Sequence, residues 1–287
     1  MNTPVTTSLA QTPLPVSAAK PLLQARAARR LPQERRWSTP VIVLAQCALL
    51  IGGVLAWELS ARQGWIDSFF WSQPSKIQEV LMVFFTQGDA WIDISFTFRA
   101  TLAGFIIGTT LGTLIGLSFW WSGNYAAIVQ PFIVCFESIP KLALAPLIIL
   151  VFGIGLPSKI AIGVALTVVV SALTTFAGVK SVDRDLERLM YALGASRWQV
   201  FCKLVVPSVL PWGISVLRVN IGLALTGSIV GEFISSQHGL GRAILYAGQT
   251  YEIALVWVAV LVLSTLSILM YVAVAHIERV LMKHVKR

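Results

Sequence analysis

Residues 96–121 read FTFRATLAGFIIGTTLGTLIGLSFWW, and the class of fold follows from this segment. It is long enough to cross a bilayer, which takes about 20 apolar residues. Its glycines at positions 104, 108, 112 and 116 repeat every four residues, so in a helix they form a flat strip along one face. Small residues at this spacing let two helix backbones approach closely in lipid. The segment therefore predicts a membrane helix that packs tightly against a neighbour.

The composition extends this prediction to the rest of the chain. Of its 287 residues, 56% are hydrophobic and 12% are charged, whereas soluble domains average about 25% charged residues. A soluble protein would have to bury several helices of about 20 apolar residues in one small domain, so we exclude that class. We expect an all-α integral membrane protein with about six transmembrane helices, at residues 41–59, 96–121, 126–152, 160–179, 209–234 and 253–276.

The segments outside these spans differ in composition. Residues 1–36 are rich in Pro, Ala, Thr, Gln and Arg without an apolar period, which predicts a disordered basic tail before a transmembrane domain at 37–287. Residues 63–94 mix Trp and Phe with Asp, Pro and Lys, which is typical of an amphipathic segment at the membrane interface. Residues 180–207 form a more polar loop. Prolines that should break the third span stand at positions 131, 140 and 146.

Positive charges predict the orientation, because Lys and Arg collect in cytosolic loops. With the N-terminus inside, the cytosolic side holds the tail, the 180–207 loop and the C-terminal end, where most Lys and Arg residues lie. The outer side holds Arg62, Lys76, Lys159 and Arg242. We therefore expect both termini and the 180–207 loop in the cytosol. The net charge of +9 then reflects topology, and we expect no nucleic-acid partner.

The sequence shows no constellation of catalytic or metal-binding residues. Cys47, Cys135 and Cys202 lack metal-ligand or redox spacing, and the three histidines do not cluster. There is no GxxxxGK[ST] phosphate loop, and no GxSxG pattern of a serine hydrolase. We therefore expect no enzyme activity, cofactor or metal in this chain.

The segment YALGASRWQVFCKLVVPSVLP, residues 191–211, lies between two apolar runs and contains a break at Gly194. Asp183 and Asp185 precede it at a predicted helix start, where acidic side chains suit the positive end of the dipole. Pro207 suits the first turn of the fifth span. The predicted result is a pair of short helices joined directly to a membrane helix. One face of the second helix would hold Trp198, Phe201, Leu204 and Val205.

Two interpretations of this helix pair remain open from the pattern alone. It could dock onto a partner protein and pass rigid-body motion into the membrane. It could instead lie on the bilayer surface as an interfacial amphipathic helix, since amphipathic character serves both arrangements.

Three blocks of sequence together resemble a known family. They are ESIPKLALAPLIILVFGIG at 137–155, the 191–211 segment, and ALTGSIVGEFISSQHGLG at 224–241. In that order they resemble the permeases of ABC importers, of the nitrate/sulfonate/taurine branch, over roughly residues 40–280. The spacing from Gly194 to Pro207 resembles the EAA loop of these permeases. The resemblance implies the type I importer permease (MetI-like) fold.

The resemblance also implies a site. In this family the loop is a coupling helix that sits in a groove of a cytosolic ATPase. Two positions depart from the family pattern, because Arg188 and Met190 stand where Glu and Ala are usual, although Glu187 is adjacent. The residues expected to couple to the ATPase are Glu187, Gly194, Ala195, Ser196, Arg197, Trp198, Phe201 and Pro207.

The partners implied by the resemblance are an ABC ATPase dimer, which hydrolyses ATP, and a periplasmic or extracellular substrate-binding protein. A second permease chain, expected to be a copy of this one, would complete the path across a bacterial inner membrane and its lipid. The implied substrates are small anions such as aliphatic sulfonates, taurine or nitrate. A thiamine-precursor pyrimidine or another small metabolite is the alternative. A stand-alone secondary carrier and a membrane scaffold are the other function classes.

Charged residues inside the spans are candidates for the translocation path, because intramembrane charge usually faces a cavity or a partner. Glu137 and Lys141 are four residues apart and could pair on one helix face. Arg218 and Glu232 are predicted to share roughly one face of the fifth span. The alternative for each is a structural ion pair, or a side chain that reaches the membrane edge.

Overall fold

A computed structural model describes residues 38–285, with side chains described as far as Lys283. All regular secondary structure in this range is helical. The described residues up to Leu55 belong to one unit and those from Ala56 to another, and helix α2 (Thr39–Arg62) crosses the boundary. The predicted disordered tail, residues 1–36, lies outside the described residues.

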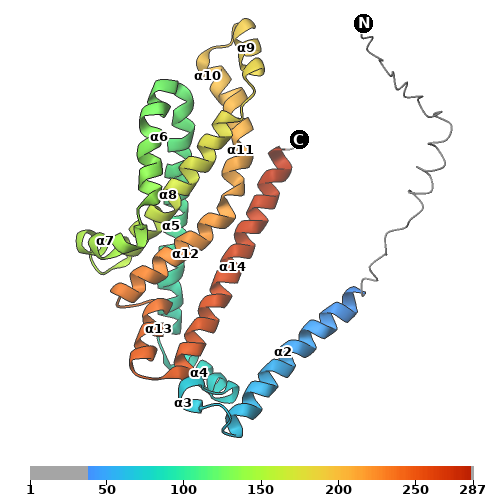
Figure 1. The fold of residues 1–287 in the computed structure, drawn as a ribbon, viewed down its shortest axis with the longest axis vertical. Helices are drawn as coiled ribbons and strands as arrows, with labels where there is room; N and C mark the ends of the chain where they lie inside the picture. The colour runs from blue at the N-terminus through green and yellow to red at the C-terminus, as the bar shows by residue number, and fades with distance from the viewer. Residues whose placement is uncertain (1–37, 286–287) are drawn as a thin grey trace, which may run out of the picture. The chain divides into compact units, whose positions relative to one another are not determined.

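The second unit is built on four long helices (Figure 1). They are α5 (Ala90–Ser118), α8 (Leu156–Lys180), α12 (Leu217–Ile234) and α14 (Ile253–Val285). The shorter helices are α3 (Ser68–Trp71), α4 (Pro74–Gln87), α6 (Gly123–Ser138), α7 (Ala145–Phe152), α9 (Arg184–Ala192), α10 (Arg197–Val200), α11 (Val206–Ser215) and α13 (Leu240–Gln249). Two 3-10 turns, η1 (Phe119–Trp121) and η2 (Lys141–Leu144), and a π-turn, η3 (Phe201–Val205), complete the order.

The predicted membrane spans are confirmed as helices, with changes at their ends. Among the described residues, five helices are long and apolar enough to cross a bilayer. A sixth is added if α6 and the η2–α7 segment, which meet at 79°, count as one broken span. The break falls at Ile139 and Pro140, as predicted for Pro140, because proline cannot continue a helix hydrogen-bond ladder. The prediction is wrong for Pro131, which lies inside α6, and Pro146 lies in the first turn of α7, where proline is tolerated. The fifth predicted span is divided into α11 and α12 at Val216.

The glycine strip of α5 packs against α8, as its spacing predicts. A Cβ atom added to Gly104 would lie 3.2 Å from the Cα atom of Gly163, and one on Gly108 would lie 1.9 Å from Thr167 Oγ1. One added to Gly112 would lie 2.2 Å from the carbonyl oxygen of Val168. The two backbones thus touch over three helical turns, at a distance that a larger side chain would prevent.

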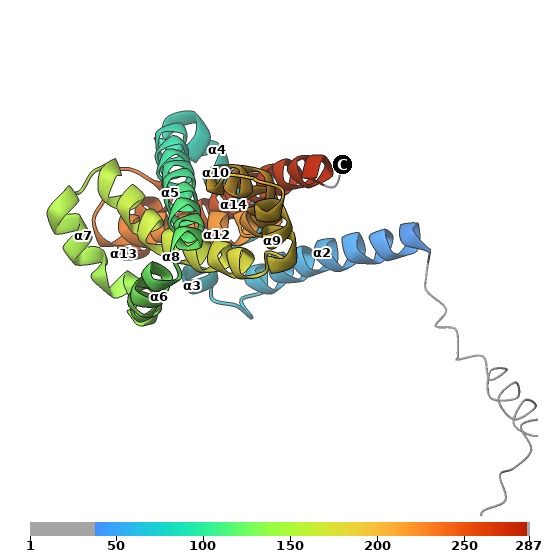
Figure 2. The ribbon, with the colours of Figure 1, turned by 90° about the horizontal axis from the view of Figure 1, so that it is seen from above.

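The order of these contacts shows that α5 and α8 run in the same direction, because residue numbers rise together on both helices. The chain between them must therefore return along the length of the bundle. The α6–η2–α7 segment makes this return, which favours a broken span over a loop that enters and leaves on one side. In Figures 1 and 2, α7 projects sideways from the bundle on the side away from α14.

A polar contact ties α12 to this helix pair. Asn220 of α12 is buried, and its side-chain amide donates to Thr109 Oγ1 at 2.9 Å and to Ser171 Oγ at 2.5 Å. Thr109 belongs to α5 and Ser171 to α8, so one amide joins three helices. Small side chains at the crossing make room for it, and buried polar groups need such partners.

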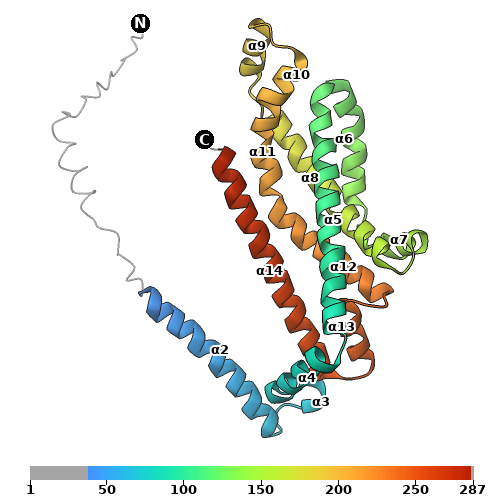
Figure 3. The same cartoon turned by 180° about the vertical axis from the view of Figure 1, so that it is seen from behind.

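The predicted interfacial segment at 63–94 consists of α3, α4 and the first residues of α5. Helix α4 is amphipathic: Ile77 and Phe84 are buried while Gln78 and Glu79 are exposed. Helix α5 begins at Ala90, earlier than the predicted residue 96. In Figures 1 and 3, α3, α4 and α13 lie at one end of the unit, and α9, α10 and the last turns of α14 lie towards the other.

Replacing Gly112 by alanine should destabilise the protein, because the carbonyl group of Val168 is backbone and cannot move aside. We expect the free energy of unfolding to fall by about 1–3 kcal/mol, the usual cost of overpacking. Unfolding in mixed detergent micelles, followed by circular dichroism, measures it.

The matched control is Gly222→Ala in α12, where an added Cβ would have no atom within 4 Å. This change should be neutral or slightly stabilising, since alanine is the better helix former by about 1 kcal/mol. Equal stability of Gly112→Ala and Gly222→Ala would contradict the packing of α5 on α8.

Candidate functional site

The loop between α8 and α11 folds into two short helices, as predicted. Asp183 caps α9: its Oδ1 atom accepts hydrogen bonds from the backbone N–H groups of Asp185, at 2.8 Å, and Leu186, at 3.4 Å. No residue of α9 is buried. The helix is therefore held by its ends and presents its sides to the surroundings.

Gly194 ends α9 in the way its position predicts. Its φ angle is +83°, which side-chain-bearing residues rarely adopt. The N–H of Gly194 donates to Tyr191 O and the N–H of Ala195 donates to Met190 O, both at 3.0 Å. This pair of bonds is a Schellman motif, which satisfies the last carbonyl groups of a helix.

Ser196 begins α10 with a capping box. Its Oγ atom accepts from Gln199 N at 3.3 Å, and its own N–H donates to Gln199 Oε1 at 2.7 Å. The Ser-x-x-Gln pattern at 196–199 signals this motif in the sequence, and our sequence analysis missed it. Only residues 193–196 separate the two helices, so the turn between them is short and fully bonded.

The second helix continues into the membrane helix without a break, through the π-turn at Phe201–Val205. The N–H of Val206 donates to Phe201 O, five residues back. Pro207 follows directly, and its ring would clash with the carbonyl group four residues earlier in a regular α-helix. The wider turn accommodates this proline, as such turns do in many helices.

The predicted apolar face of α10 and η3 is only partly buried. Val205 is buried, and Phe201 and Leu204 are half-buried, but Trp198 is 61% exposed. Val200, which our sequence analysis left out, is fully buried. The face therefore turns from the protein interior at Val205 towards the surroundings at Trp198.

Aromatic rings join this helix pair to the α5–α6 turn. Trp121 of η1 packs on Trp198, with ring centroids 6.0 Å apart, and on Phe201 at 5.3 Å. The guanidinium group of Arg197 lies 5.4 Å from the Trp121 ring and 5.5 Å from the Trp120 ring, and it also donates to Trp121 O. Arg197, predicted to contact the ATPase, is thus engaged within its own chain.

Large apolar side chains are exposed along the helix pair, and we call this set the apolar tip. Leu193, at the turn, is 79% exposed, and Trp198 is 61% exposed. Single exposed apolar residues are common, but several large ones on one short polar segment favour an interaction surface. The apolar tip consists of Leu186, Leu189, Tyr191, Leu193 and Trp198.

The charged residues of the loop lie beside the apolar tip. Glu187, Lys180 and Arg184 line a cleft of about 400 Å³ between α6, α8 and α9. Arg188, one of the two departures from the family pattern, pairs with Asp185 on the same helix at 3.3 Å, and both side chains are strongly exposed. Exposed pairs of this kind contribute little to stability.

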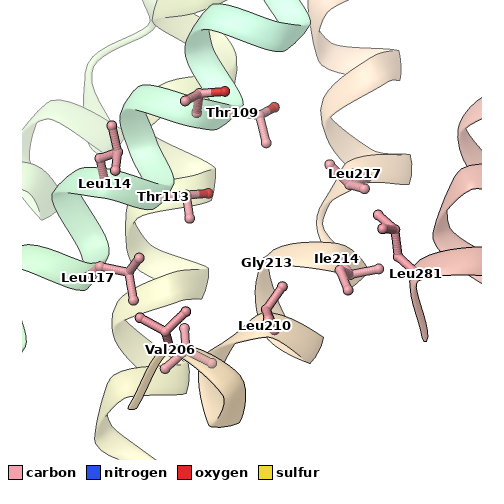
Figure 4. Close-up of a pocket in the computed structure, with 12 residues that line it drawn as sticks. Thr109, Thr113, Leu114, Leu117, Val206, Leu210, Gly213, Ile214, Leu217 and Leu281 are labelled. Atoms are coloured by element: carbon pink, nitrogen blue, oxygen red, sulfur yellow. The ribbon is translucent and has the colours of Figure 1, made fainter. Parts of the chain in front are cut away.

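A separate apolar cavity of about 320 Å³ lies between α5, α11, α12 and α14 (Figure 4). Its wall includes Thr109 and Thr113 of α5, Gly213 of α11 and Leu281 of α14. No charged side chain lines it, and none of the four predicted path residues does.

Two of the predicted path residues pair with each other. Lys141 Nζ lies 2.9 Å from Glu137 Oε2 and donates to Glu137 O at 3.1 Å, across the break between α6 and η2. The lysine side chain is 9% exposed and the glutamate side chain 41%. The charge that faces outward at this break is therefore mainly the carboxylate.

The other two predicted path residues do not share a contact. Arg218 pairs with Glu278 of α14. Glu232 is 1% exposed and bonds within the protein at the other end of α12. Lys159, assigned to the outer side in the sequence analysis, is also fully buried: its Nζ donates to Ile154 O, Ser158 Oγ and Ser235 O.

These features define a multi-pass membrane protein with a loop of two short capped helices and a broken span. Residues 108–283 match the family described as binding-protein-dependent transport system inner membrane component, and the chain belongs to this family.

Relatives with assigned names cover most of the chain. The formylaminopyrimidine transport permease protein ThiX of Halalkalibacterium halodurans is 32% identical over 80% of this chain and 91% of its own length. The riboflavin transport system permease protein RibX of Chloroflexus aurantiacus is 27% identical, over 95% of this chain and 98% of its own. The taurine transport system permease protein TauC of Escherichia coli is 26% identical, over 85% and 90%, respectively.

Solved structures support the fold. An inward-facing MetNI methionine ABC transporter chain is 21% identical, with a TM-score of 0.54, over 67% of this chain and 93% of its own. A chain of a bacterial ABC transporter that imports alginate is 15% identical, with a TM-score of 0.61, over 91% of this chain and 96% of its own. The predicted type I importer permease fold is thus confirmed.

Replacing Trp121 by alanine should loosen the helix pair, because it removes two ring contacts and part of the site for Arg197. Such aromatic pairs contribute about 0.5–1.5 kcal/mol each, so amide hydrogen exchange at residues 197–205 should accelerate about tenfold. Hydrogen exchange with mass spectrometry measures this. The control is Trp65→Ala, since Trp65 is 79% exposed; unchanged exchange in Trp121→Ala would show that the rings do not hold the loop.

Proposed function

We propose that this chain is the membrane subunit of an ATP-driven importer, and that α9 and α10 dock onto a separate ATPase. The apolar tip is the observation that carries this proposal. The tip has five large side chains on a short, capped helix pair. Their exposure to water is unfavourable, and a groove of a partner protein would bury them. The capped turn and the unbroken π-turn favour a rigid connection from the tip to α11.

The orientation and assembly follow from the same proposal. The α9–α10 end faces the cytosol with both termini, in agreement with the positive charges. A second copy of this chain forms the other half of the path, and the bilayer is that of a bacterial inner membrane. ATP hydrolysis belongs to the ATPase subunits, so this chain is not itself an enzyme.

Coupling then works by rigid-body motion. The ATPase pair moves the α9–α10 helices when it binds ATP, and the motion reaches α8 and α11 through the chain and α5 through the aromatic contacts of Trp121. ATP can shift the transporter towards an outward-open state only if that state binds ATP more tightly. Arg197 and Phe201 take part in this coupling through contacts inside the chain. The full set of residues that serve it in the proposal is Glu187, Gly194, Ala195, Ser196, Arg197, Trp198, Phe201 and Pro207.

For the substrate we favour a small nitrogen heterocycle of the pyrimidine type. The named relative at 32% identity transports formylaminopyrimidine, and another transports riboflavin. The exposed charge at the α6 break is the Glu137 carboxylate, which does not attract anions. Sulfonates and taurine are the second candidate, favoured by relatives in Escherichia coli and by Lys141 at the break.

The docking proposal predicts that Leu189→Asp abolishes ATPase binding, because a carboxylate would be buried in the groove. Leu189 is 54% exposed, so the change should leave folding intact. Purification in mild detergent, with quantification of the retained ATPase, should show at least a tenfold loss at an unchanged amount of permease.

The control for this experiment is Gln78→Asp, an exposed position on α4 that receives the same side chain. It should retain the ATPase. If wild-type protein carries no ATPase and transports without ATP, the chain is a secondary carrier and the proposal fails.

The substrate is tested by uptake into proteoliposomes that contain the complex and its binding protein, with labelled formylaminopyrimidine and labelled taurine. If Lys141 attracts an anionic substrate, Lys141→Gln lowers taurine uptake at least fivefold, and adding Glu137→Gln does not restore it. If the two residues form a structural pair, the single change lowers uptake and the amount of protein together, and the double change restores both.

A further inference from the structure

The cleft of about 400 Å³ between α6, α8 and α9 carries positive charge that the chain does not neutralise. We call it the basic cleft, because Lys180 at the end of α8 and Arg184 at the start of α9 both line it. Within residues 38–283, neither side chain forms an ion pair. The ammonium group of Lys180 lies 4.3 Å from the centroid of the Phe176 ring, and this contact leaves its charge free for an anion.

The basic cleft exists because α6 presents small residues to it. Gly123, Ala126 and Ala127 line the cleft at helical spacing, three and four residues apart. A Cβ atom added to Gly123 would have no atom within 4 Å. The floor is apolar, since the buried rings of Phe119 and Phe176 pack there with centroids 4.7 Å apart. The cleft is therefore apolar at its floor, while its two cations are exposed at its rim.

The basic cleft lies where three apolar segments end. The span that contains α5 ends at Trp121, the span of α8 ends at Lys180, and the broken span begins at Gly123. Trp120 also lines the cleft. Tryptophan favours the level of the lipid headgroups, and a lysine at the end of a span reaches that level as well. These positions put the cleft at the height of the headgroups.

The third charged residue of the basic cleft narrows the choice of anion. Glu187 lines the cleft, is partly buried and forms no ion pair within the described part of the chain. Its carboxylate would repel a bare phosphate ion, but it accepts hydrogen bonds from hydroxyl groups. A phosphodiester with hydroxyl groups beside it therefore suits all three charged side chains.

We propose that the basic cleft binds phosphatidylglycerol, an anionic phospholipid whose phosphate carries a glycerol headgroup. Lys180 and Arg184 bind the phosphate, Glu187 accepts from the glycerol hydroxyl groups, and the acyl chains leave across the apolar floor. Basic pockets between membrane helices on the cytosolic side bind anionic headgroups in this way. This inference goes beyond the proposed function and concerns the permease chain alone.

A headgroup bound in this way joins two helices. Lys180 is the last residue of α8 and Arg184 the first of α9, so a phosphate that contacts both spans the turn at residues 181–183. The direction of α9 relative to α8 then depends on the lipid as well as on the chain. Removing the lipid would therefore loosen the start of the docking helices.

The site is tested by native mass spectrometry of the permease in mild detergent, titrated with phosphatidylglycerol or with phosphatidylcholine. We expect the wild-type protein to bind phosphatidylglycerol at least tenfold more tightly. The double variant Lys180→Gln/Arg184→Gln should lose this preference, because both groups that bind the phosphate are gone. The matched control, Arg279→Gln/Lys283→Gln, removes the same charge from exposed positions near the end of α14 and should keep the preference.

The shape of the basic cleft is tested separately with Ala127→Trp, which keeps both cations and fills the space beside α6. Ala127 is exposed, so the protein should fold normally, and circular dichroism checks this. We expect phosphatidylglycerol to bind at least tenfold more weakly. The matched control is Ala48→Trp, the same change at an exposed position of α2, which should bind as the wild type does.

Several outcomes would overturn the proposal. A wild-type protein without the preference, or an equal loss in both double variants, would show general attraction between charges and no site. Unchanged binding in Ala127→Trp would place the lipid elsewhere. Displacement of the lipid by an equal concentration of soluble glycerophosphoglycerol would make the cleft a site for a free phosphodiester.

An acidic side chain of the ATPase is the other possible occupant of the basic cleft. In that case Lys180→Gln/Arg184→Gln loses the retained ATPase while its preference for phosphatidylglycerol is unchanged, and the lipid proposal fails. Lipid binding is measured on the permease without its partners, so its result does not depend on whether the importer function holds.

Discussion

The contact between α5 and α8 is the constraint on which the rest of the structure depends. In lipid there is no hydrophobic force between two apolar helices, so close backbone packing has to hold them together. Four glycines on α5 provide that approach, and hydroxyl-bearing side chains of α8 fill the surface opposite. Because the two helices are parallel, the chain between them must cross back in the opposite direction, and the broken span α6–α7 does this. After α8 the chain runs back again through α11 and α12.

The two ends of the α5–α8 helix pair make different contacts. At one end, η1 follows α5 and meets α10 through Trp121, while α8 leads directly into α9. At the other end, Asp93 and Thr97 of α5 and Lys159 of α8 hold the connection to α13. The same rigid pair therefore lies between the proposed ATPase contact and the buried side chains that hold the α12–α13 connection. Tight packing along its length means that a displacement at one end is not absorbed by loose side chains on the way.

The sequence was most informative where local patterns determine structure. The glycine period, Pro140 of the third span, and Gly194 between two short helices all predicted what is found. It failed where residues far apart converge. Lys159 stands beside a turn in the sequence, and nothing there indicates that it is buried and bonded to carbonyl groups of residues 154 and 235. Arg218 and Glu232 were matched by helical period, but Arg218 pairs with Glu278 of α14 and Glu232 bonds to Thr97 of α5, which no period can reveal.

The π-turn at Phe201–Val205 has a consequence for the direction in which the docking helix faces. Each residue of an α-helix turns the chain by about 100° and advances it by about 1.5 Å. A π-turn holds one residue more than a regular turn. Converting it into a regular α-helical turn would therefore rotate α10 by roughly 100° around the axis of α11. Pro207 prevents this conversion, since it offers no N–H to close the tighter ladder. One proline in the membrane helix thus fixes the direction in which Trp198 points around the helix axis, although Trp198 lies nine residues earlier in the chain.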